Sequence, residues 1–413
     1  MTESTATKPK LVIFDVEGVI IPKNRLYFEI GRTLGFVALL KILFFGFLYQ
    51  VGILPLKRAL VKIFHTMAGV KITVFDKILT QLPLMPGTKE VFAFLKAQGS
   101  KTALISSGLP TFLVQKLALS FGAEYAFGIE VGINGDALTG EIWGDPIERK
   151  GKLLILKKIV ELEGLKLNEC AVIGDDRNNV SLFFDGIQKI GYHPDFVIRA
   201  KADFVINGSL SNVLIALNPK AKVPSLSARN LLREFIHASA FLIAVFALFL
   251  GQFLVALIIC SLIAIYIVSE FERLRGKNFP VISQITRNAA SQSELCDFTL
   301  APLYFAFGIL FTLLIFPYPA NSAAIAIFAL GDSSASIIGG FLPKKPLPLN
   351  RGKTLTGTLG GFFFGFLAGS VFVSPWLALI GAATATIIEY LPLPVNDNLL
   401  MPICTGFVLT FLI

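Results

Sequence analysis

The second half of the chain consists largely of apolar stretches, and this feature constrains the fold more than any other. About seven such stretches follow residue 233, and several are shorter than the roughly 20 residues that an upright membrane-spanning helix requires. They are 236–250, 253–269, 298–316, 321–339, 355–374, 376–391 and 398–413. Hydrophobic residues make up 54% of the chain and charged residues 16%, whereas soluble proteins carry about 25% charged residues. The sequence therefore predicts an all-α polytopic membrane domain of about seven transmembrane helices over 234–413.

Basic residues are concentrated in alternate connections between these stretches. They precede the first stretch, lie between the second and third at 273–287, and lie between the fourth and fifth at 344–353. Loops rich in Lys and Arg face the cytosol, so we expect a multi-pass integral membrane protein whose N-terminal domain is cytosolic. The net charge of +9 fits contact with anionic lipid. The basic residues form no nucleic-acid-binding pattern, and we expect no nucleic-acid partner.

Residues 1–215 show a different pattern, in which short apolar runs alternate with helical stretches such as Lys152–Glu163. Such alternation predicts a parallel sheet covered by helices, a Rossmann-like α/β domain. A polar segment, 216–233, is expected to link this domain to the membrane domain at 234–413. The predicted strands are Lys10–Phe14, Thr102–Ile105, Cys170–Ile173 and Asp195–Ile198.

Two carboxylates, Asp15 and Glu17, follow the first predicted strand. Open α/β sheets bind ligands at the carboxyl ends of their strands. Asp15 is a candidate nucleophile that would form an aspartyl phosphate, and Glu17 a candidate general acid and base. The second strand ends in Ser106 and Ser107, whose hydroxyls suit a phosphate, and Ser106 is the preferred candidate.

A third strand ends in Asp175 and Asp176, and carboxylate oxygens are the ligands that Mg²⁺ prefers. Lys152 opens the preceding helix and is expected to neutralise phosphate charge, with Lys150 as an alternative. The ordered set therefore predicts Mg²⁺-dependent phosphoryl transfer.

These motifs resemble the haloacid dehalogenase (HAD) superfamily, in particular its phosphoserine-phosphatase-like branch. The resemblance covers roughly residues 10–210 and implies a helical cap inserted at about 22–85. It implies hydrolysis or transfer of a phosphomonoester, with a phosphorylated small molecule or a lipid phosphate as partner. It also implies that Asn179 supports the metal site of Asp15, Asp175 and Asp176. The family carries Asp at the positions of Glu17 and Asn179, so a degenerate HAD module that senses a phosphometabolite and regulates a membrane partner is an alternative.

Within the expected cap, Leu34–Leu54 is strongly apolar. A complete crossing would separate Asp15 from Asp175, which one active site needs together. An interfacial helix or a hairpin that dips into the lipid fits better, and a buried cap helix is the alternative.

Ionisable residues also interrupt the apolar stretches of the second half. Asp332 lies in the fourth stretch, Asp397 and Asn398 open the seventh, and His237 opens the first. Charged side chains in apolar spans are costly and therefore indicate a functional site. A basic, Gly- and Thr-containing connection lies in the same predicted cytosolic region. Its candidate phosphate-binding residues are Lys344, Lys345, Arg351, Lys353, Thr354 and Gly357.

This arrangement resembles the dolichol kinase, phytol kinase and CTP-dependent diacylglycerol kinase family over about 228–413. The resemblance implies phosphorylation of a membrane lipid or isoprenoid alcohol with the nucleotide triphosphate CTP as donor. It implies that Asp332 and Asp397 are catalytic, that Asp332 holds Mg²⁺, and that His237 and Asn398 help to bind the nucleotide. A cytidylyltransferase that forms a CDP-lipid is the alternative. The sequence leaves the oligomeric state and the identity of the alcohol open.

Overall fold

The structure, a computed structural model, describes residues 8–50, 52–217, 228–342, 345–393 and 395–413. It divides into two compact units, 1–222 and 223–413, which we call the α/β unit and the helical unit. The division falls inside the predicted linker, of which residues 218–227 lie outside the described part. Each unit is described by itself.

The α/β unit is built on a seven-stranded sheet in the order β4-β3-β2-β1-β5-β6-β7. Neighbouring strands run parallel except β3 and β4, which form an antiparallel hairpin at one edge. Without β4 the order is that of a doubly wound Rossmann sheet, which confirms the predicted fold class. The strands are β1 (Leu11–Asp15), β2 (Lys101–Pro110), β3 (Tyr125–Asn134), β4 (Ala137–Trp143), β5 (Cys170–Gly174), β6 (Gln188–Tyr192) and β7 (Phe204–Ile206).

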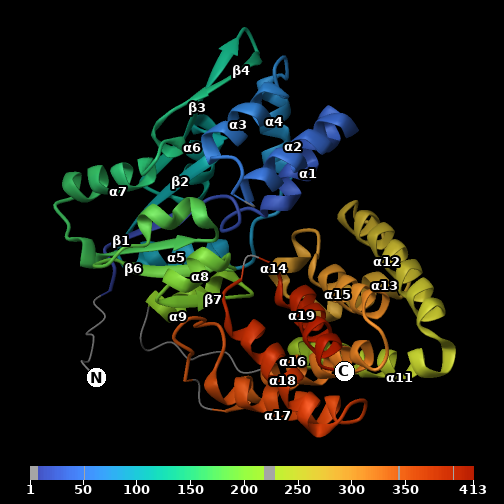
Figure 1. The fold of residues 1–413 in the computed structure, drawn as a ribbon. Coiled ribbons are helices and arrows are strands. Elements are labelled where there is room, and N and C mark those ends of the chain that lie inside the picture. Colours follow the sequence, from blue (N-terminus) through green and yellow to red (C-terminus); the bar gives the residue numbers. More distant parts are fainter. Residues whose placement is uncertain (1–7, 51, 218–227, 343–344, 394) are drawn as a thin grey trace. The chain divides into compact units, whose positions relative to one another are not determined.

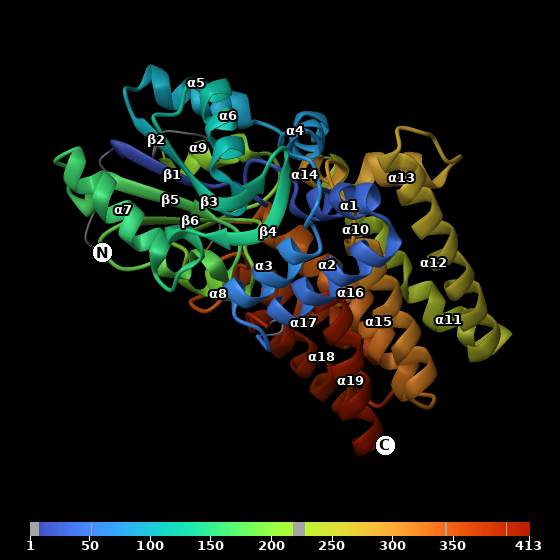
Figure 2. The ribbon, with the colours of Figure 1, turned by 90° about the horizontal axis from the view of Figure 1, so that it is seen from above.

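Helices cover both faces of this sheet (Figure 2). On one face, α7 (Gly151–Leu162) and α8 (Phe196–Lys201) bury apolar side chains against alternate residues of the central strands. On the other face, α5 (Thr88–Ala97) stacks Phe92 between Phe14 of β1 and Phe121 of α6 (Thr111–Phe121). All five residues of β1 are buried, so the strand that carries Asp15 lies in the middle of the core.

One predicted strand is wrong. Asp195–Ile198 begins helix α8, because the Asp195 side chain accepts a hydrogen bond from the Ile198 backbone N–H at 2.9 Å and caps the helix. A short apolar run does not by itself distinguish a strand from a helix, whereas the capping aspartate favours the helix. A short helix, α9 (Val213–Leu217), ends the described part of this unit.

Four helices form the cap between β1 and α5. They are α1 (Lys23–Leu34), α2 (Phe36–Gln50), α3 (Leu56–His65) and α4 (Ile72–Gln81). The apolar segment noted in the sequence becomes α2, a 15-residue helix. At 1.5 Å per residue it is about 22 Å long, which is shorter than the roughly 30 Å apolar core of a bilayer.

The helical unit contains ten helices among its described residues (Figure 1). They are α10 (Ala228–Ser239), α11 (Phe241–Leu250), α12 (Gln252–Leu274), α13 (Ile282–Ala289), α14 (Gln292–Leu295), α15 (Ala301–Ile315), α16 (Ala320–Phe341), α17 (Leu355–Gly369), α18 (Pro375–Tyr390) and α19 (Asp397–Leu412). Three segments are long and apolar enough to cross a membrane, namely Arg229–Leu250, Gln252–Leu274 and Ala320–Phe341. Four further apolar helices contain 15 or 16 residues, so the seven-span topology remains a proposal.

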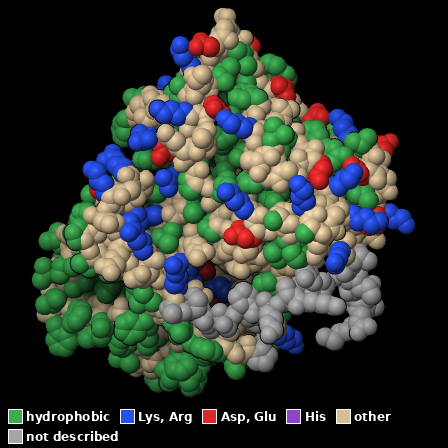
Figure 3. Space-filling model, turned by 180° about the vertical axis from the view of Figure 1, so that it is seen from behind, with side chains coloured by type: hydrophobic (Ala, Val, Ile, Leu, Met, Phe, Trp, Pro, Cys, Tyr) green, Lys and Arg blue, Asp and Glu red, His purple; other side chains and the backbone are tan. Residues whose placement is uncertain are grey.

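Helix α16 forms the centre of this unit, because it packs against α10, α11, α15, α17, α18 and α19. Its contact with α17 depends on glycines. A Cβ atom added to Gly357 would lie 2.6 Å from the Ala335 carbonyl oxygen, and one added to Gly361 would lie 2.8 Å from the Ala335 Cβ. Small residues allow helix backbones to approach closely in apolar surroundings. Large hydrophobic side chains remain exposed on the outside of the unit and gather on the face shown in Figure 3.

Candidate functional site

The register of the sheet brings three strand ends together. Asp15 of β1 pairs with Ile105 of β2, and Phe14 pairs with Ile173 of β5. Ser106 therefore follows directly beside Asp15 on one side, and Gly174 and Asp175 follow on the other. The sequence motifs predicted to act together thus meet at one edge of the sheet.

Asp15 is held as a buried carboxylate by donors from three parts of the chain. One oxygen accepts hydrogen bonds from Lys152 Nζ at 3.0 Å and from the Val16 N–H at 2.9 Å. The other accepts one from the Asn179 amide. Only 2% of Lys152 is exposed, and Lys150 lies exposed at the surface. Lys152, and not Lys150, is the lysine of this site.

Asn179 joins the nucleophile to the lysine. Its amide oxygen accepts from Lys152 Nζ at 2.7 Å, while its nitrogen faces Asp15 and lies 3.5 Å from Asp175 Oδ1. The expectation that Asn179 supports the metal site stays a prediction, and in the structure its amide oxygen accepts from Lys152. In the structure Asn179 links Asp15 to Lys152.

Glu17 and Ser106 form a second buried pair. The Ser106 hydroxyl donates to Glu17 Oε1 at 2.9 Å and accepts from the Leu109 N–H at 2.8 Å. Burial, followed by the charge of Asp15, raises the pKa of Glu17 above its ordinary value, as a general acid requires. Ser107, the alternative, donates to the Pro146 carbonyl.

Three carboxylates, from Asp15, Asp175 and Asp176, have oxygen atoms within 4.8 Å of one another. Hard oxygen ligands of this kind fit Mg²⁺. Burial raises the pKa of Asp175 well above its ordinary value. For Asp176 burial acts in the same direction, but Lys23 outweighs it and lowers the pKa.

Sequence reasoning missed Lys23, Tyr27 and Tyr49, because no motif showed which cap residues reach the sheet. Lys23 forms an ion pair with Asp176 and lies 3.7 Å from Asp175. These residues line a small cavity of about 50 Å³, partly open to solvent, between the strand ends and the cap. The cap side of the cavity consists of Lys23, Tyr27, Gly46, Tyr49, Leu56, Ala59, Leu60 and Ile63.

Comparisons with known proteins show which family this unit is similar to. Residues 12–182 match the model of the haloacid dehalogenase-like hydrolases. The α/β unit is a HAD-like domain. The chain is 27% identical over 199 residues to the phosphoserine phosphatase of Methanocaldococcus jannaschii, a match that covers 48% of this chain and 92% of that protein.

A second relative is the phosphoserine phosphatase of Archaeoglobus fulgidus, which is 29% identical over 175 residues. That match covers 42% of this chain and 49% of the relative. Among solved structures, a phospho-aspartyl intermediate analogue of phosphoserine phosphatase is 26% identical, with 48% of this chain and 94% of that chain covered and a TM-score of 0.44.

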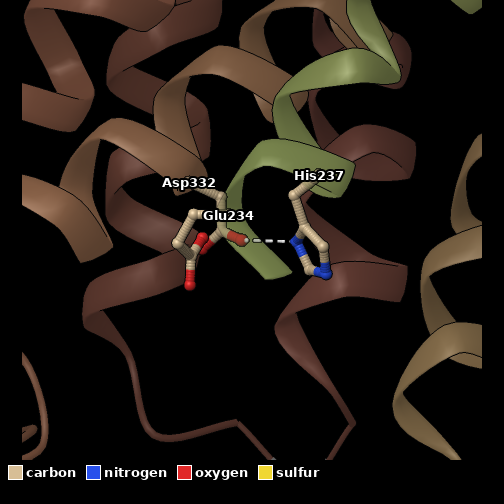
Figure 4. A group of neighbouring side chains, drawn as sticks. All are labelled: Glu234, His237 and Asp332. Carbon is tan, nitrogen blue, oxygen red and sulfur yellow. Dashed lines mark hydrogen bonds and ion pairs between the residues drawn. The ribbon is translucent and has the colours of Figure 1, made fainter. Parts of the chain in front are cut away.

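A second group of polar side chains lies inside the helical unit. Glu234 and His237 of α10 face Asp332 of α16 (Figure 4). His237 Nδ1 lies 3.3 Å from Asp332 Oδ2, and the three side chains offer ligand atoms within 4.8 Å of one another. Only 3% of Glu234 and 6% of Asp332 are exposed. Glu234 was missed because the sequence pattern singled out only His237 as a candidate site residue in this turn.

Lys353 lies next to this group and joins three helices. Its Nζ lies 2.6 Å from Glu389 Oε1, 3.5 Å from Asp397 Oδ2 and 3.9 Å from Asp332 Oδ1. Burial disfavours its charge, but the three carboxylates outweigh burial and raise its pKa above its usual range. The expectation that a triphosphate engages this lysine, while a metal ion neutralises the carboxylates, stays a prediction. In the structure the lysine neutralises the carboxylates.

The other predicted nucleotide-binding residues lie in the connection before α17, in the first turn of α17 and at the start of α19, and their role in nucleotide binding stays a prediction. Lys345 and Arg351 are exposed, and Lys344 lies outside the described residues. Thr354 caps α17 by accepting from the Gly357 N–H at 3.2 Å. Gly357 itself provides the close approach to α16, so its role in the structure is helix packing. Asn398 lies in the first turn of α19 and donates its backbone N–H to Asn396 Oδ1 at 3.0 Å.

Proposed function

We propose that the HAD-like domain hydrolyses a phosphomonoester through an aspartyl phosphate on Asp15. The observation that carries the proposal is the buried constellation of Asp15, Lys152, Ser106 and Glu17 at one edge of the sheet. Two relatives are named phosphoserine phosphatases. Their names support phosphatase chemistry and suggest phosphoserine as one substrate.

The residues present suggest the following sequence. Asp15 attacks phosphorus, the bond to the ester oxygen breaks, and Glu17 donates a proton to the departing alcohol. Glu17, now ionised, accepts a proton from the water that attacks the phosphorus of the aspartyl phosphate, which regenerates Asp15 and releases phosphate. Lys152 and the Ser106 hydroxyl stabilise the charge that develops on the phosphoryl oxygens.

The acidic group of Asp15, Asp175 and Asp176 fits a Mg²⁺ ion, because all its donors are hard oxygens. When bound there, the ion would supply additional neutralisation of phosphate charge. Lys23 provides positive charge to the same carboxylates from the cap.

The test is Mg²⁺-dependent release of phosphate from p-nitrophenyl phosphate by the full-length protein in detergent. Asp15→Asn is expected to abolish the release. Asp185→Asn is the matched control, because Asp185 is fully exposed and pairs only with Lys189 among the ion pairs of the described residues. Undiminished hydrolysis by Asp15→Asn would contradict the assignment, and no hydrolysis by the unaltered protein would favour a sensor module.

For the helical unit we propose transfer of the γ-phosphoryl group of CTP to a lipid alcohol. The specific observation in support is a buried Glu234 oxygen that has no hydrogen-bond partner among the described residues and lies beside Asp332. Arg233 Nη2 lies 3.6 Å from Oε1 of Glu234, so Oε2 is the oxygen left over, and a buried carboxylate oxygen without a partner is costly and indicates a cationic ligand. Glu234 and Asp332 would hold Mg²⁺, whose charge neutralises phosphate oxygens in phosphoryl transfer.

Labelled CTP distinguishes the candidate reactions of this unit. A kinase transfers label from the γ-phosphate to a polyprenol, whereas a cytidylyltransferase transfers label from the α-phosphate. Asp332→Asn is expected to remove most of the transfer, while Asp15→Asn leaves it largely intact because Asp15 belongs to the other unit. Near-normal transfer by Asp332→Asn would refute this site.

A further inference from the structure

The cap side of the cavity is mostly apolar. Leu56, Ala59, Leu60 and Ile63 recur at helical spacing, so one face of α3 lines the cavity opposite the carboxylates. Ala59, Leu60 and Ile63 are each no more than 7% exposed. A substrate whose phosphate reaches Asp15 therefore places the rest of its structure against an apolar wall.

The cavity has few polar groups that suit an amino-acid substrate. Among the described residues that line it, the carboxylates are Asp15, Glu17 and Asp176, all of which belong to the catalytic or metal-ligand group. Lys23 is already paired with Asp176. The ammonium group of phosphoserine would thus enter without a carboxylate of its own, and an unpaired charge in a buried site is strongly unfavourable.

Two tyrosines mark the boundary between the polar and apolar parts. Burial raises the pKa of Tyr27 to about 12, and it raises the pKa of Tyr49 above its usual range, so both remain neutral hydroxyls. The Tyr49 hydroxyl is buried and has no hydrogen-bond partner among the described residues. It is available to a neutral oxygen next to the phosphate, such as an ester or hydroxyl oxygen.

Helix α2 lines the cavity with Gly46 and Tyr49 and presents a continuous apolar surface to the outside. Its exposed residues include Phe36 at 72%, Leu43 at 51% and Phe44 at 56%. Exposed basic residues flank this surface, namely Lys41 of α2 and Arg58 and Lys62 of α3. An apolar face with a basic border is complementary to a bilayer with anionic headgroups.

We infer that the HAD-like domain takes a lipid phosphomonoester from the membrane, with the apolar chain lying along the α3 wall and α2 inserted into the interface. The inference rests on the phosphatase function proposed above. It replaces the amino-acid substrate suggested by the relatives with an amphiphile that has a neutral, apolar group beyond the phosphate.

The first test compares kcat/KM of the full-length protein for butyl, hexyl and octyl phosphate with the value for O-phosphoserine. Each methylene that enters the apolar cavity is expected to raise kcat/KM by up to about fourfold. O-Phosphoserine should be the poorest substrate. A flat series or a preference for O-phosphoserine overturns the inference but leaves phosphatase function intact, whereas no hydrolysis of any ester, p-nitrophenyl phosphate included, removes both.

A pair of variants locates the chain-binding wall. Leu56→Asn, at the partly exposed rim of the cavity, is expected to reduce the octyl-to-butyl ratio of kcat/KM severalfold. Leu119→Asn is the matched control, because Leu119 is 82% exposed on α6, outside the cap. An unchanged ratio in Leu56→Asn would exclude α3 as the wall.

The second test places hexadecyl phosphate in nanodiscs that also contain the full-length protein and an anionic lipid. Turnover is expected to follow the mole fraction of hexadecyl phosphate in the disc, and Leu43→Ser should raise the half-saturating mole fraction relative to Leu119→Ser. Turnover that follows the bulk concentration instead overturns the membrane source. A change of oligomeric state in Leu43→Ser shows that protein covers α2 and overturns it as well.

Discussion

Replacing Asn179 with aspartate adds a charge at the centre of the HAD-like site. The amide nitrogen lies 3.5 Å from Asp175 Oδ1 and also contacts Asp15, so the new carboxylate would face two others. A unit charge about 5 Å from a divalent ion contributes roughly 7 kcal/mol at an effective dielectric constant of about 20. Lys152, at 2.7 Å from the amide oxygen, neutralises much of this charge. We therefore expect a net gain of about 1.4 kcal/mol or more, which is a tenfold lower half-saturating Mg²⁺ concentration.

The assay for this prediction is phosphate release from p-nitrophenyl phosphate as a function of Mg²⁺ concentration. Asn207→Asp makes the same charge change at an exposed position after β7 and serves as the control. In the absence of Mg²⁺, the Asn179→Asp variant should also unfold at lower temperature, because repulsion among the carboxylates is then not offset. An unchanged or higher Mg²⁺ requirement would show that residue 179 does not face the metal-ligand group.

Three further predictions concern other parts of the chain. Because the pKa of Glu17 is raised, activity on butyl phosphate should decline as pH rises through that pKa, above 4.5. Glu17→Gln should lose roughly 10²–10⁴-fold of kcat/KM for butyl phosphate but far less of kcat/KM for p-nitrophenyl phosphate, because kcat/KM reports formation of the aspartyl phosphate and this leaving group needs no proton; equal losses of kcat/KM would argue against a general acid. Gly361→Leu should abolish the single size-exclusion peak of the detergent-solubilised protein, since a Cβ atom there already meets Ala335 at 2.8 Å, while Ala264→Leu on the exposed side of α12 should retain it. The fragment 1–222 corresponds to nearly all of one free-standing relative, and it should still bind anionic vesicles at low salt through α2; a fragment that does not sediment with vesicles would contradict membrane contact.

The sequence predicted the HAD-like site well because its chemistry lies at strand ends. A buried strand followed by a carboxylate fixes both the position and the direction of that side chain, so Asp15, Ser106 and Asp175 could be placed together from the strand pattern alone. Lys152 was also found, since it opens the helix that precedes β5. The cap residues Lys23 and Tyr49 could not be found, because the path of an inserted helix across the sheet depends on packing between distant segments.

The sequence predicted the helical unit less well. Its apolar stretches predicted where helices occur, but hydropathy alone does not determine whether a helix of 15 or 16 residues crosses the bilayer. Hydropathy also did not reveal that Gly357 allows α17 to pack closely against α16, or that Lys353 forms ion pairs with carboxylates. Those roles arise from contacts between helices. The sequence of the basic loop does not indicate which carboxylates contact it.

The ion pairs of Lys353 also impose an order on biosynthesis. Its partners come from α16, α18 and α19, which lie on both sides of Lys353 in the sequence. During synthesis, Asp332 enters the nascent helical unit before Lys353 and well before Asp397 are available. The polar centre of the unit can therefore be completed only once α19 has been synthesised, so the full set of ion pairs of Lys353 forms after the earlier helices have been made.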